Sequence, residues 1–114
     1  GFIQLKRIFD YVVKNIDSDP IVIDANDILK NPLVALDHLC NALKISYTDK
    51  MLSWEKGYRK TDGVWASHWY NNVVDTNKFI SFKKNENSIP KEYMNIYRKS
   101  MDIYNQLYDY RIKF

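Results

Sequence analysis

The chain of 114 residues is 46% hydrophobic and 27% charged, a composition that excludes intrinsic disorder. Its net charge of +3, from 17 basic and 14 acidic residues mixed along the sequence, excludes the concentrated basic face of a nucleic-acid-binding protein. A single cysteine excludes an internal disulfide and favours a reducing compartment, and no apolar run is long enough to span a membrane. We therefore expect a cytoplasmic protein with neither nucleic acid nor membrane as partner.

The length predicts one domain, residues 1–114. The sequence enters helical periodicity at its second residue, with neither an initiator Met nor the regions of a signal peptide. We interpret the chain as a single truncated domain.

Three segments have the periodicity of amphipathic helices. Residues 2–16 place apolar side chains at helical spacing, with charged residues opposite. Asn31-Pro32 is typical of a helix start and precedes a Leu-rich stripe that ends at Leu43. Residues 90–112 repeat Tyr, Ile, Met and Leu at intervals of three and four, which predicts a long terminal helix.

The segments between these helices carry weaker signals. Residues 49–52 have the features of a short helix, and residues 64–74 predict a short aromatic helix. Residues 83–88 are polar, and we expect them to be loose.

Ile21-Val22-Ile23 is a continuous β-branched run, which predicts one short buried strand. A buried strand needs hydrogen-bonding partners for its backbone. Three sources are open: residues 78–82, a second chain, or a sheet whose other strands lie outside this chain. We favour the missing sheet, because a fully apolar strand between helices is typical of a parallel α/β sheet.

The order of elements after this strand resembles a block of the sulfotransferase family. There a strand runs into a Tyr-Glu-Asp-Leu type segment, followed by Pro and a helix that ends in a Leu-Gly pair. Here Asp27-Ile28 (or Asp27 with Leu29) stands for the acidic-apolar part and Leu43-Lys44 for the Leu-Gly pair. Lys44 therefore occupies the position of the usual helix-ending glycine.

A second stretch, Arg59-Lys60-Thr61-Asp62-Gly63-Val64-Trp65, resembles the Arg-Lys-Gly…Gly-Asp-Trp loop of the same family. Two departures are that Thr61 replaces a glycine and that the gap before Gly63 is one residue shorter. The string of Trp54, Gly57, His68 and Trp69 around it looks closer still to a divergent bacterial sulfotransferase-like branch.

The resemblance implies the C-terminal part of an α/β three-layer P-loop fold, here mainly α with one short buried strand. The parent would transfer a sulfuryl group from 3′-phosphoadenosine-5′-phosphosulfate to a small-molecule hydroxyl or amine. In that family the loop closes over the 3′-phosphate, which implies that the donor-binding residues are Arg59, Lys60, Thr61, Gly63 and Trp65. Arg supplies a planar fork of donors for phosphate, and Lys adds a compact charge.

The chain lacks the rest of such a site. No Gly-rich turn is followed by Lys and Ser or Thr, so the P-loop is absent, and the family's catalytic base lies upstream of the matched block. We assign no catalytic residue here, leave open whether the chain is an enzyme, and expect it to be inactive alone with no donor bound. Its expected partner is the missing N-terminal half of the domain, or a second copy that pairs through the strand edge.

Other interpretations remain. The alternative to a sulfotransferase fragment is a small helical interaction module without catalysis, which dimerises through its unpaired strand edge and its Tyr-rich helix. Arg59 and Lys60 would also suit a solvated pair with Asp62 as local partner, and the Trp residues would suit core packing. A third reading, an enzyme that uses His68 with Asp62 or Asp75, has no supporting nucleophile–base spacing. His38 and Cys40 face different ways on one helix, so no metal site is expected.

Overall fold

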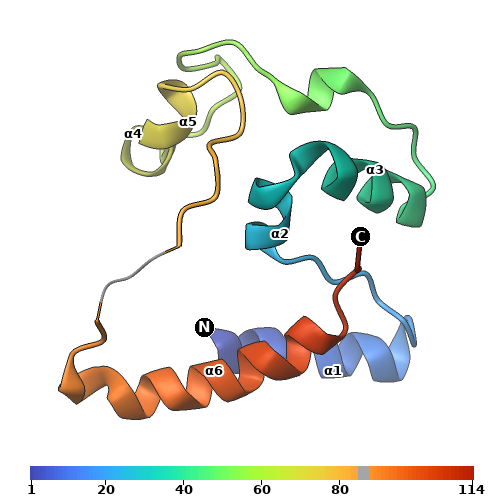
Figure 1. The fold of residues 1–114 in the computed structure, drawn as a ribbon, viewed down its shortest axis with the longest axis vertical. Coiled ribbons are helices and arrows are strands. Elements are labelled where there is room, and N and C mark those ends of the chain that lie inside the picture. The colour runs from blue at the N-terminus through green and yellow to red at the C-terminus, as the bar shows by residue number, and fades with distance from the viewer. Residues whose placement is uncertain (85–87) are drawn as a thin grey trace. The chain divides into compact units, whose positions relative to one another are not determined.

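A computed structural model describes residues 1–84 and 88–114, and in these ranges the protein is mainly helical (Figure 1). Residues 85–87, which the sequence predicted to be loose together with their neighbours, lie outside the described residues. The chain forms two compact units: Gly1–Asp24 with Lys83–Phe114, and Ala25–Phe82.

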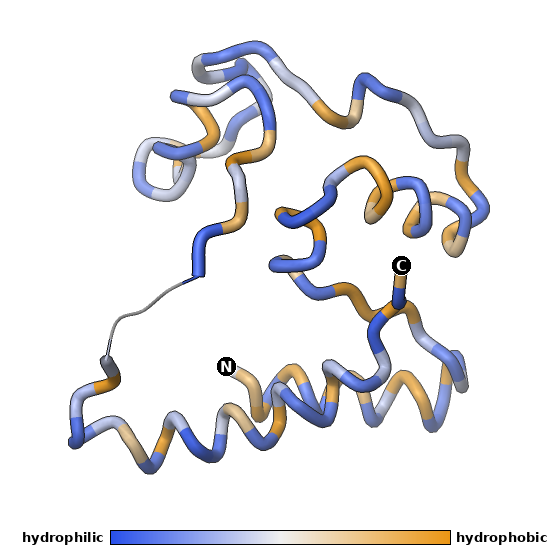
Figure 2. Tube along the Cα trace, viewed as in Figure 1, coloured by the Kyte–Doolittle hydropathy of each residue, from blue (hydrophilic) through white to orange (hydrophobic). Residues whose placement is uncertain are grey.

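The first unit is built on two amphipathic helices. Helix α1 (Phe2–Asn15) packs against α6 (Met94–Asp109), which follows the short 3-10 helix η2 (Lys91–Tyr93). Both helices were predicted from their periodicity, although α6 is shorter than residues 90–112. Hydrophobic residues recur along each of them in Figure 2. Aromatic contacts join the helical segments: the rings of Phe9 and Tyr110 lie 4.9 Å apart, and those of Phe2 and Tyr104 meet edge to face at 6.1 Å.

The predicted buried strand at residues 21–23 does not form. Val22 makes one isolated parallel bridge to Arg111, in which the Ile112 N–H donates to the Val22 carbonyl at 2.9 Å. Ile21 is 41% exposed, and Ile23 is half-buried. The strand prediction was wrong for a physical reason. A strand depends on the hydrogen-bond ladder it shares with a neighbouring strand. Among the described residues, the short segment after α6 supplies a single bridge to Val22.

The second unit holds four short α-helices and one 3-10 helix. These are α2 (Ala25–Lys30), α3 (Pro32–Ala42), η1 (Asp49–Leu52), α4 (Ala66–Trp69) and α5 (Asn71–Val74). The sequence predicted α3 and η1 but missed α2, and the expected aromatic helix at residues 64–74 is two single turns. The Asn31 side chain caps α3, as predicted, by accepting the Val34 N–H at 3.4 Å.

Helix α3 ends in a Schellman motif. The Lys44 N–H donates to the Asn41 carbonyl at 3.1 Å, and the Ile45 N–H donates to the Cys40 carbonyl at 3.0 Å. Lys44 itself adopts a positive φ of 57°, the left-handed conformation that glycine adopts without cost. The residue that departs from the family pattern is therefore held in the backbone conformation of the glycine it replaces.

Residues 78–82, one of the three predicted sources of a partner for residues 21–23, lie in the second unit. Lys78 makes an antiparallel bridge to Ser53 within that unit.

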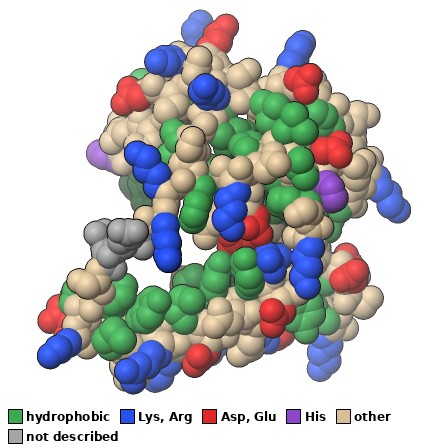
Figure 3. Space-filling model, in the orientation of Figure 1, with side chains coloured by type: hydrophobic (Ala, Val, Ile, Leu, Met, Phe, Trp, Pro, Cys, Tyr) green, Lys and Arg blue, Asp and Glu red, His purple; other side chains and the backbone are tan. Residues whose placement is uncertain are grey.

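Few side chains of the described residues are fully enclosed. The buried hydrophobic residues are Ala35, Cys40, Ala66 and Leu107. Cys40 is buried on the apolar side of α3, with its thiol 3.8 Å from the Met51 sulfur. Larger apolar side chains remain at the surface, and Figure 3 shows hydrophobic patches between charged side chains on one face of the molecule. Such exposure is typical of a surface that another part of a protein covers.

Candidate functional site

The five predicted donor-binding residues lie in one loop, residues 58–73, whose ends are joined by backbone hydrogen bonds. The Gly57 N–H donates to the Val74 carbonyl at 2.8 Å, and the Trp54 N–H donates to the Asn77 carbonyl at 2.9 Å. Gly57 has a φ of 99°, which side-chain-bearing residues rarely adopt, so this turn requires glycine. We refer to residues 58–73 as the donor loop.

A side chain reinforces the same junction. The Trp54 indole N–H donates to the Val73 carbonyl at 3.2 Å, and its ring meets Phe79 edge to face at 5.4 Å. The core-packing interpretation therefore describes the half-buried Trp54 well. The sequence analysis missed its role in closing the loop, because nothing local in the sequence indicates a contact with a residue so far along the chain.

Within the donor loop, residues 59–62 form a closed turn. The Asp62 N–H donates to the Arg59 carbonyl at 3.0 Å, and the Asp62 carboxylate accepts the Arg59 N–H at 2.8 Å. The carboxylate thus binds the backbone of Arg59 and not its charged head. Over the described ranges, neither the Arg59 guanidinium nor the Lys60 ammonium has an ion-pair partner. Both exposed cations are therefore available to an anion.

The other three predicted residues are also exposed. Thr61 lies in the turn, and the Gly63 carbonyl accepts the Ala66 N–H at 3.0 Å as α4 begins. Gly63 has no left-handed φ, and a Cβ placed on it would meet nothing within 4 Å. Neither the backbone conformation nor steric crowding at position 63 requires glycine. Because no atom crowds Gly63, its backbone is accessible. Trp65 comes directly before α4 and is 69% exposed.

The aromatic residues of the donor loop face outward. Trp69 is 77% exposed, and Tyr70 and His68 are also exposed. Core packing, the more conservative interpretation of these side chains, is therefore wrong for Trp65 and Trp69. Ala66 is the one buried residue of α4, so a small side chain anchors this turn and leaves the indoles at the surface.

An enzyme that uses His68 gains no support from the geometry. Over residues 1–84 and 88–114, no hydrogen bond joins His68 to Asp62 or Asp75, and Asp62 is engaged by the Arg59 backbone. The described residues contain no group of three or more His, Cys, Asp or Glu that could hold a metal ion. In the same ranges no helix has both the length and the apolar character that crossing a bilayer requires.

Comparison with known proteins identifies the family to which the chain belongs. The sulfotransferase domain family matches residues 12–109, from within α1 to the last residue of α6. The chain therefore belongs to the sulfotransferase domain family, and its helices are part of a P-loop fold. The match includes the whole donor loop.

Two curated relatives come from Arabidopsis thaliana. Branched-chain-amino-acid aminotransferase-like protein 1 is 36% identical over 88 residues, and protein 2 of the same name is 32% identical over 88 residues. Each alignment covers 77% of this chain but 16% of the relative, so the chain spans about a sixth of their length. No solved structure matches the chain.

Proposed function

We propose that the chain is the C-terminal, donor-closing part of a sulfotransferase. The intact enzyme would transfer a sulfuryl group from 3′-phosphoadenosine-5′-phosphosulfate to a hydroxyl or amine of a small molecule. The observation that carries this proposal is the donor loop, which lies within the sulfotransferase domain match. It presents two exposed cations, neither with an ion-pair partner among the described residues, on a turn whose base is closed by backbone hydrogen bonds.

The loop residues suit a phosphate ligand. Arg59 would grip two oxygens of the 3′-phosphate with its planar guanidinium, and Lys60 would add a compact positive charge. Thr61 offers a hydroxyl donor, and the uncrowded backbone at Gly63 allows a close approach. Trp65 would support the loop. Binding the 3′-phosphate would position the donor. The charge that develops during transfer falls on the 5′-phosphate, and groups outside this loop would stabilise it.

In the proposed reaction the acceptor oxygen or nitrogen forms a bond to sulfur. The bond between sulfur and the phosphate oxygen breaks, and adenosine 3′,5′-bisphosphate leaves. A base takes the acceptor proton. Neither the P-loop nor this base is found among the 114 residues, so both would come from polypeptide outside them, the missing N-terminal half of the domain. We call the complete protein that contains this chain the intact polypeptide.

The names of the two plant relatives refer to branched-chain amino acid aminotransferases. Each alignment spans 88 residues and covers 16% of the relative, whereas the sulfotransferase family matches residues 12–109 of this chain. We therefore base the proposal on the family and not on those names.

Binding of adenosine 3′,5′-bisphosphate to the intact polypeptide tests the loop directly. We expect Arg59→Ala to weaken the affinity about 10-fold to 100-fold in calorimetry, the usual loss for a charge-assisted hydrogen bond. Arg98→Ala, which removes an exposed arginine from α6, is the matched control and should leave the affinity unchanged. Equal affinities of the Arg59 variant and the unmodified protein would refute the phosphate role.

A transfer assay with labelled donor tests whether the P-loop and the base lie outside the 114 residues. We expect sulfate transfer by the intact polypeptide and none by the purified 114-residue chain. Transfer by the chain alone would overturn the proposal that the P-loop and base lie elsewhere.

A helical module that dimerises without catalysis is the second candidate. The exposed apolar side chains of α1 and the open backbone near Ile21 favour it. Light scattering on the chain distinguishes the two: a stable dimer that does not bind adenosine 3′,5′-bisphosphate would support the module.

A further inference from the structure

The donor loop presents two tryptophans one helical turn apart. The Trp65 carbonyl accepts the Trp69 N–H at 3.1 Å, and residues four apart in such a turn place their side chains on the same face. The two indoles are 69% and 77% exposed, whereas Ala66 between them is buried. We call Trp65 and Trp69 the indole pair.

The backbone, and not the indoles, holds this turn together. The Trp65 carbonyl also accepts the His68 N–H at 3.0 Å, and the Tyr70 N–H donates to the Ala66 carbonyl at 2.9 Å. Within residues 1–84 and 88–114, neither N–H of the indole pair donates a hydrogen bond, whereas the Trp54 indole donates to the Val73 carbonyl. Trp65 therefore supports the loop through its backbone, and the indole pair presents its ring faces and N–H groups to a ligand.

The residues that flank the indole pair make the surface there apolar. Val64 is 85% exposed, and Tyr70 is also exposed. The nearest carboxylate in the sequence, that of Asp62, is engaged by the Arg59 N–H at 2.8 Å. The donor loop thus consists of a cationic turn followed by an apolar face.

The donor accounts for the cationic turn but not for the whole apolar face. An aromatic side chain carries about 150–250 Å² of surface, so the indole pair exposes roughly 200–350 Å². A donor held by its 3′-phosphate is polar along its ribose and phosphates, and its one purine can stack on a single indole. The acceptor has to meet the donor at sulfur, so it is the other molecule that the reaction brings to this loop.

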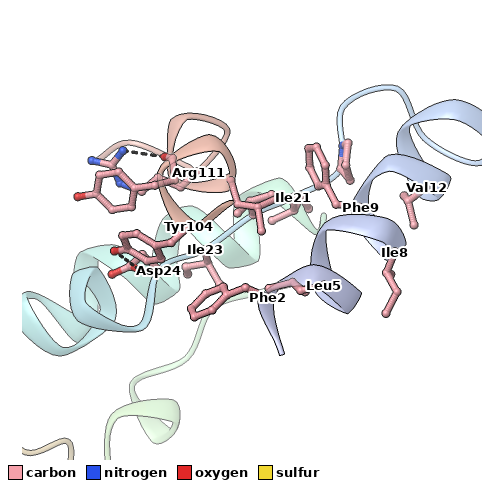
Figure 4. Close-up of a pocket in the computed structure, with 14 residues that line it drawn as sticks. Phe2, Leu5, Ile8, Phe9, Val12, Ile21, Ile23, Asp24, Tyr104 and Arg111 are labelled. Atoms are coloured by element: carbon pink, nitrogen blue, oxygen red, sulfur yellow. Dashed lines mark hydrogen bonds between the residues drawn. The ribbon is translucent and has the colours of Figure 1, made fainter. Parts of the chain in front are cut away.

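An apolar groove in the first unit is the alternative place for an acceptor. It has a volume of about 440 Å³ and is formed by one side of α1, by residues 20–24 and by the end of α6 (Figure 4). Its polar side chains contact one another: Tyr104 donates to Asp24 at 2.9 Å, and the Arg111 guanidinium carbon lies 3.5 Å from the Tyr108 ring centroid. Its described lining residues include none of the predicted donor-binding residues, whereas the indole pair shares a loop with all five. The indole pair is therefore the better candidate.

Two exposed indoles favour a ligand with an aromatic ring. Aromatic rings attract one another edge to face or offset, beyond the gain from apolar burial. A sugar would need hydrogen-bonding partners for several hydroxyls, and neither Val64 nor the ring faces supply them. The two indole N–H groups suit one oxygen or nitrogen beside an aromatic ring.

We propose that the indole pair binds the acceptor, and that the acceptor carries its hydroxyl or amine on an aromatic group. The inference rests on the proposed function, because an acceptor exists only if the intact polypeptide transfers a sulfuryl group. The transfer step is unchanged: the acceptor oxygen or nitrogen bonds to sulfur, adenosine 3′,5′-bisphosphate leaves, and the base takes the proton. Trp65 and Trp69 hold the ring and determine which acceptors are used.

Two matched alcohols test this specificity. Benzyl alcohol and cyclohexylmethanol offer the same primary hydroxyl on a six-membered ring, which is aromatic only in the first. We expect the KM of the intact polypeptide to be about 5-fold lower for benzyl alcohol, because contacts between aromatic rings add to the gain from burial. Equal KM values, or a lower KM for cyclohexylmethanol or for glucose, would overturn the inference.

Two substitutions of Trp69 separate aromatic contact from loop structure. Trp69→Leu should raise the KM for benzyl alcohol about 5-fold and that for cyclohexylmethanol less than about 2-fold, and Trp69→Phe should restore the preference. Ile8→Ala, which removes an exposed side chain from the groove wall, is the control and should change neither KM. If Ile8→Ala raises the KM for benzyl alcohol and Trp69→Leu does not, the groove is the acceptor site and the inference is wrong.

NMR of the indole N–H groups tests the contact without turnover. In the intact polypeptide saturated with adenosine 3′,5′-bisphosphate, benzyl alcohol should shift the Trp65 and Trp69 signals. The Trp54 signal, whose N–H is bonded to Val73, is the internal reference and should stay in place. Shifts of the indole pair on adding the bisphosphate, with no further change on adding benzyl alcohol, would identify the purine as the occupant and overturn the inference.

The outcomes distinguish this inference from the proposed function. Sulfate transfer that depends on Arg59, without a preference for benzyl alcohol or a response to Trp69→Leu, refutes the acceptor inference alone. Absence of both transfer and Arg59-dependent binding of adenosine 3′,5′-bisphosphate refutes the proposed function, and the inference with it.

Discussion

The Trp54 indole N–H donates a hydrogen bond of 3.2 Å to the Val73 carbonyl, across 19 residues of sequence. This bond joins the two ends of the loop that presents Arg59 and Lys60. The residues proposed to contact the donor thus depend for their placement on a tryptophan that does not itself belong to the loop.

Trp54→Phe should loosen the base of the donor loop. The substitution keeps an aromatic ring next to Phe79 but removes the indole N–H, and the loss of one such hydrogen bond lowers the free energy of unfolding by about 1 kcal/mol. Urea denaturation measures the change. Trp65→Phe is the matched control, because that indole is 69% exposed, and it should change stability by less than about 0.5 kcal/mol. A larger effect from Trp65 than from Trp54 would contradict this account of the loop.

The helices that the sequence predicted correctly are those with a strong local signal. Periodicity predicted α1 and α6, and Asn31-Pro32 marked the start of α3. The prediction of a strand at residues 21–23 was wrong, because strand formation depends on a neighbouring strand that the local sequence does not reveal. Helix α2 was missed because six residues carry too little periodicity to recognise.

The candidate site was predictable in composition but not in geometry. The pattern from Arg59 to Trp65 indicated the loop and its chemistry. The sequence did not show that Asp62 would bind the Arg59 backbone, because a carboxylate near two cations fits a salt bridge equally well. Likewise, the sequence showed Gly57 as part of the resemblance to a bacterial branch, whereas its φ of 99° makes it part of the turn that closes the loop.

Asp62 should act on donor binding in two opposing ways. Its carboxylate holds the turn by accepting the Arg59 N–H at 2.8 Å, and its negative charge opposes a phosphate nearby. Asp62→Asn keeps an oxygen acceptor and removes the charge, so we expect tighter binding of adenosine 3′,5′-bisphosphate by the intact polypeptide. Asp62→Ala removes both and should bind more weakly than Asp62→Asn. Calorimetry measures the affinity of each variant for adenosine 3′,5′-bisphosphate. Equal affinities of the Asn and Ala variants would show that the hydrogen bond from Asp62 does not order the loop.

Tyr104→Phe should weaken the first unit without disturbing its ring packing. The hydroxyl donates to Asp24 at 2.9 Å, while the ring stacks on Tyr108 with centroids 5.4 Å apart. Loss of this partly buried hydrogen bond should lower the free energy of unfolding by about 1 kcal/mol in urea denaturation. Tyr93→Phe, at an exposed position before α6, is the control and should have no measurable effect.

Tyr47 should titrate above the usual range of tyrosine. Partial burial, and then the hydrogen bond of its hydroxyl to Asp49 at 3.0 Å, raise the pKa of Tyr47 above its ordinary value. Because the folded state favours the neutral phenol, the associated stability is fully present at neutral pH. It is lost as the pH rises through the folded pKa. Carbon NMR of the tyrosine rings should show the shift, and Asp49→Asn should lower the pKa. An unchanged Tyr47 titration in that variant would refute the role of Asp49.

Lys44→Gly should stabilise the second unit. Lys44 has a φ of 57° at the end of α3, where its Cβ makes the left-handed conformation cost roughly 1–2 kcal/mol. Glycine removes this strain but gains freedom in the unfolded chain, which offsets part of the benefit. We therefore expect a net increase of about 0.5–1 kcal/mol in the free energy of unfolding, measured in urea. Lys44→Ala keeps a Cβ and should leave stability nearly unchanged, so it separates the backbone effect from loss of the lysine charge. If Gly and Ala have the same effect, the left-handed backbone at Lys44 is not strained, and the hydrogen bonds from Lys44 and Ile45 to the end of α3 hold it without appreciable cost.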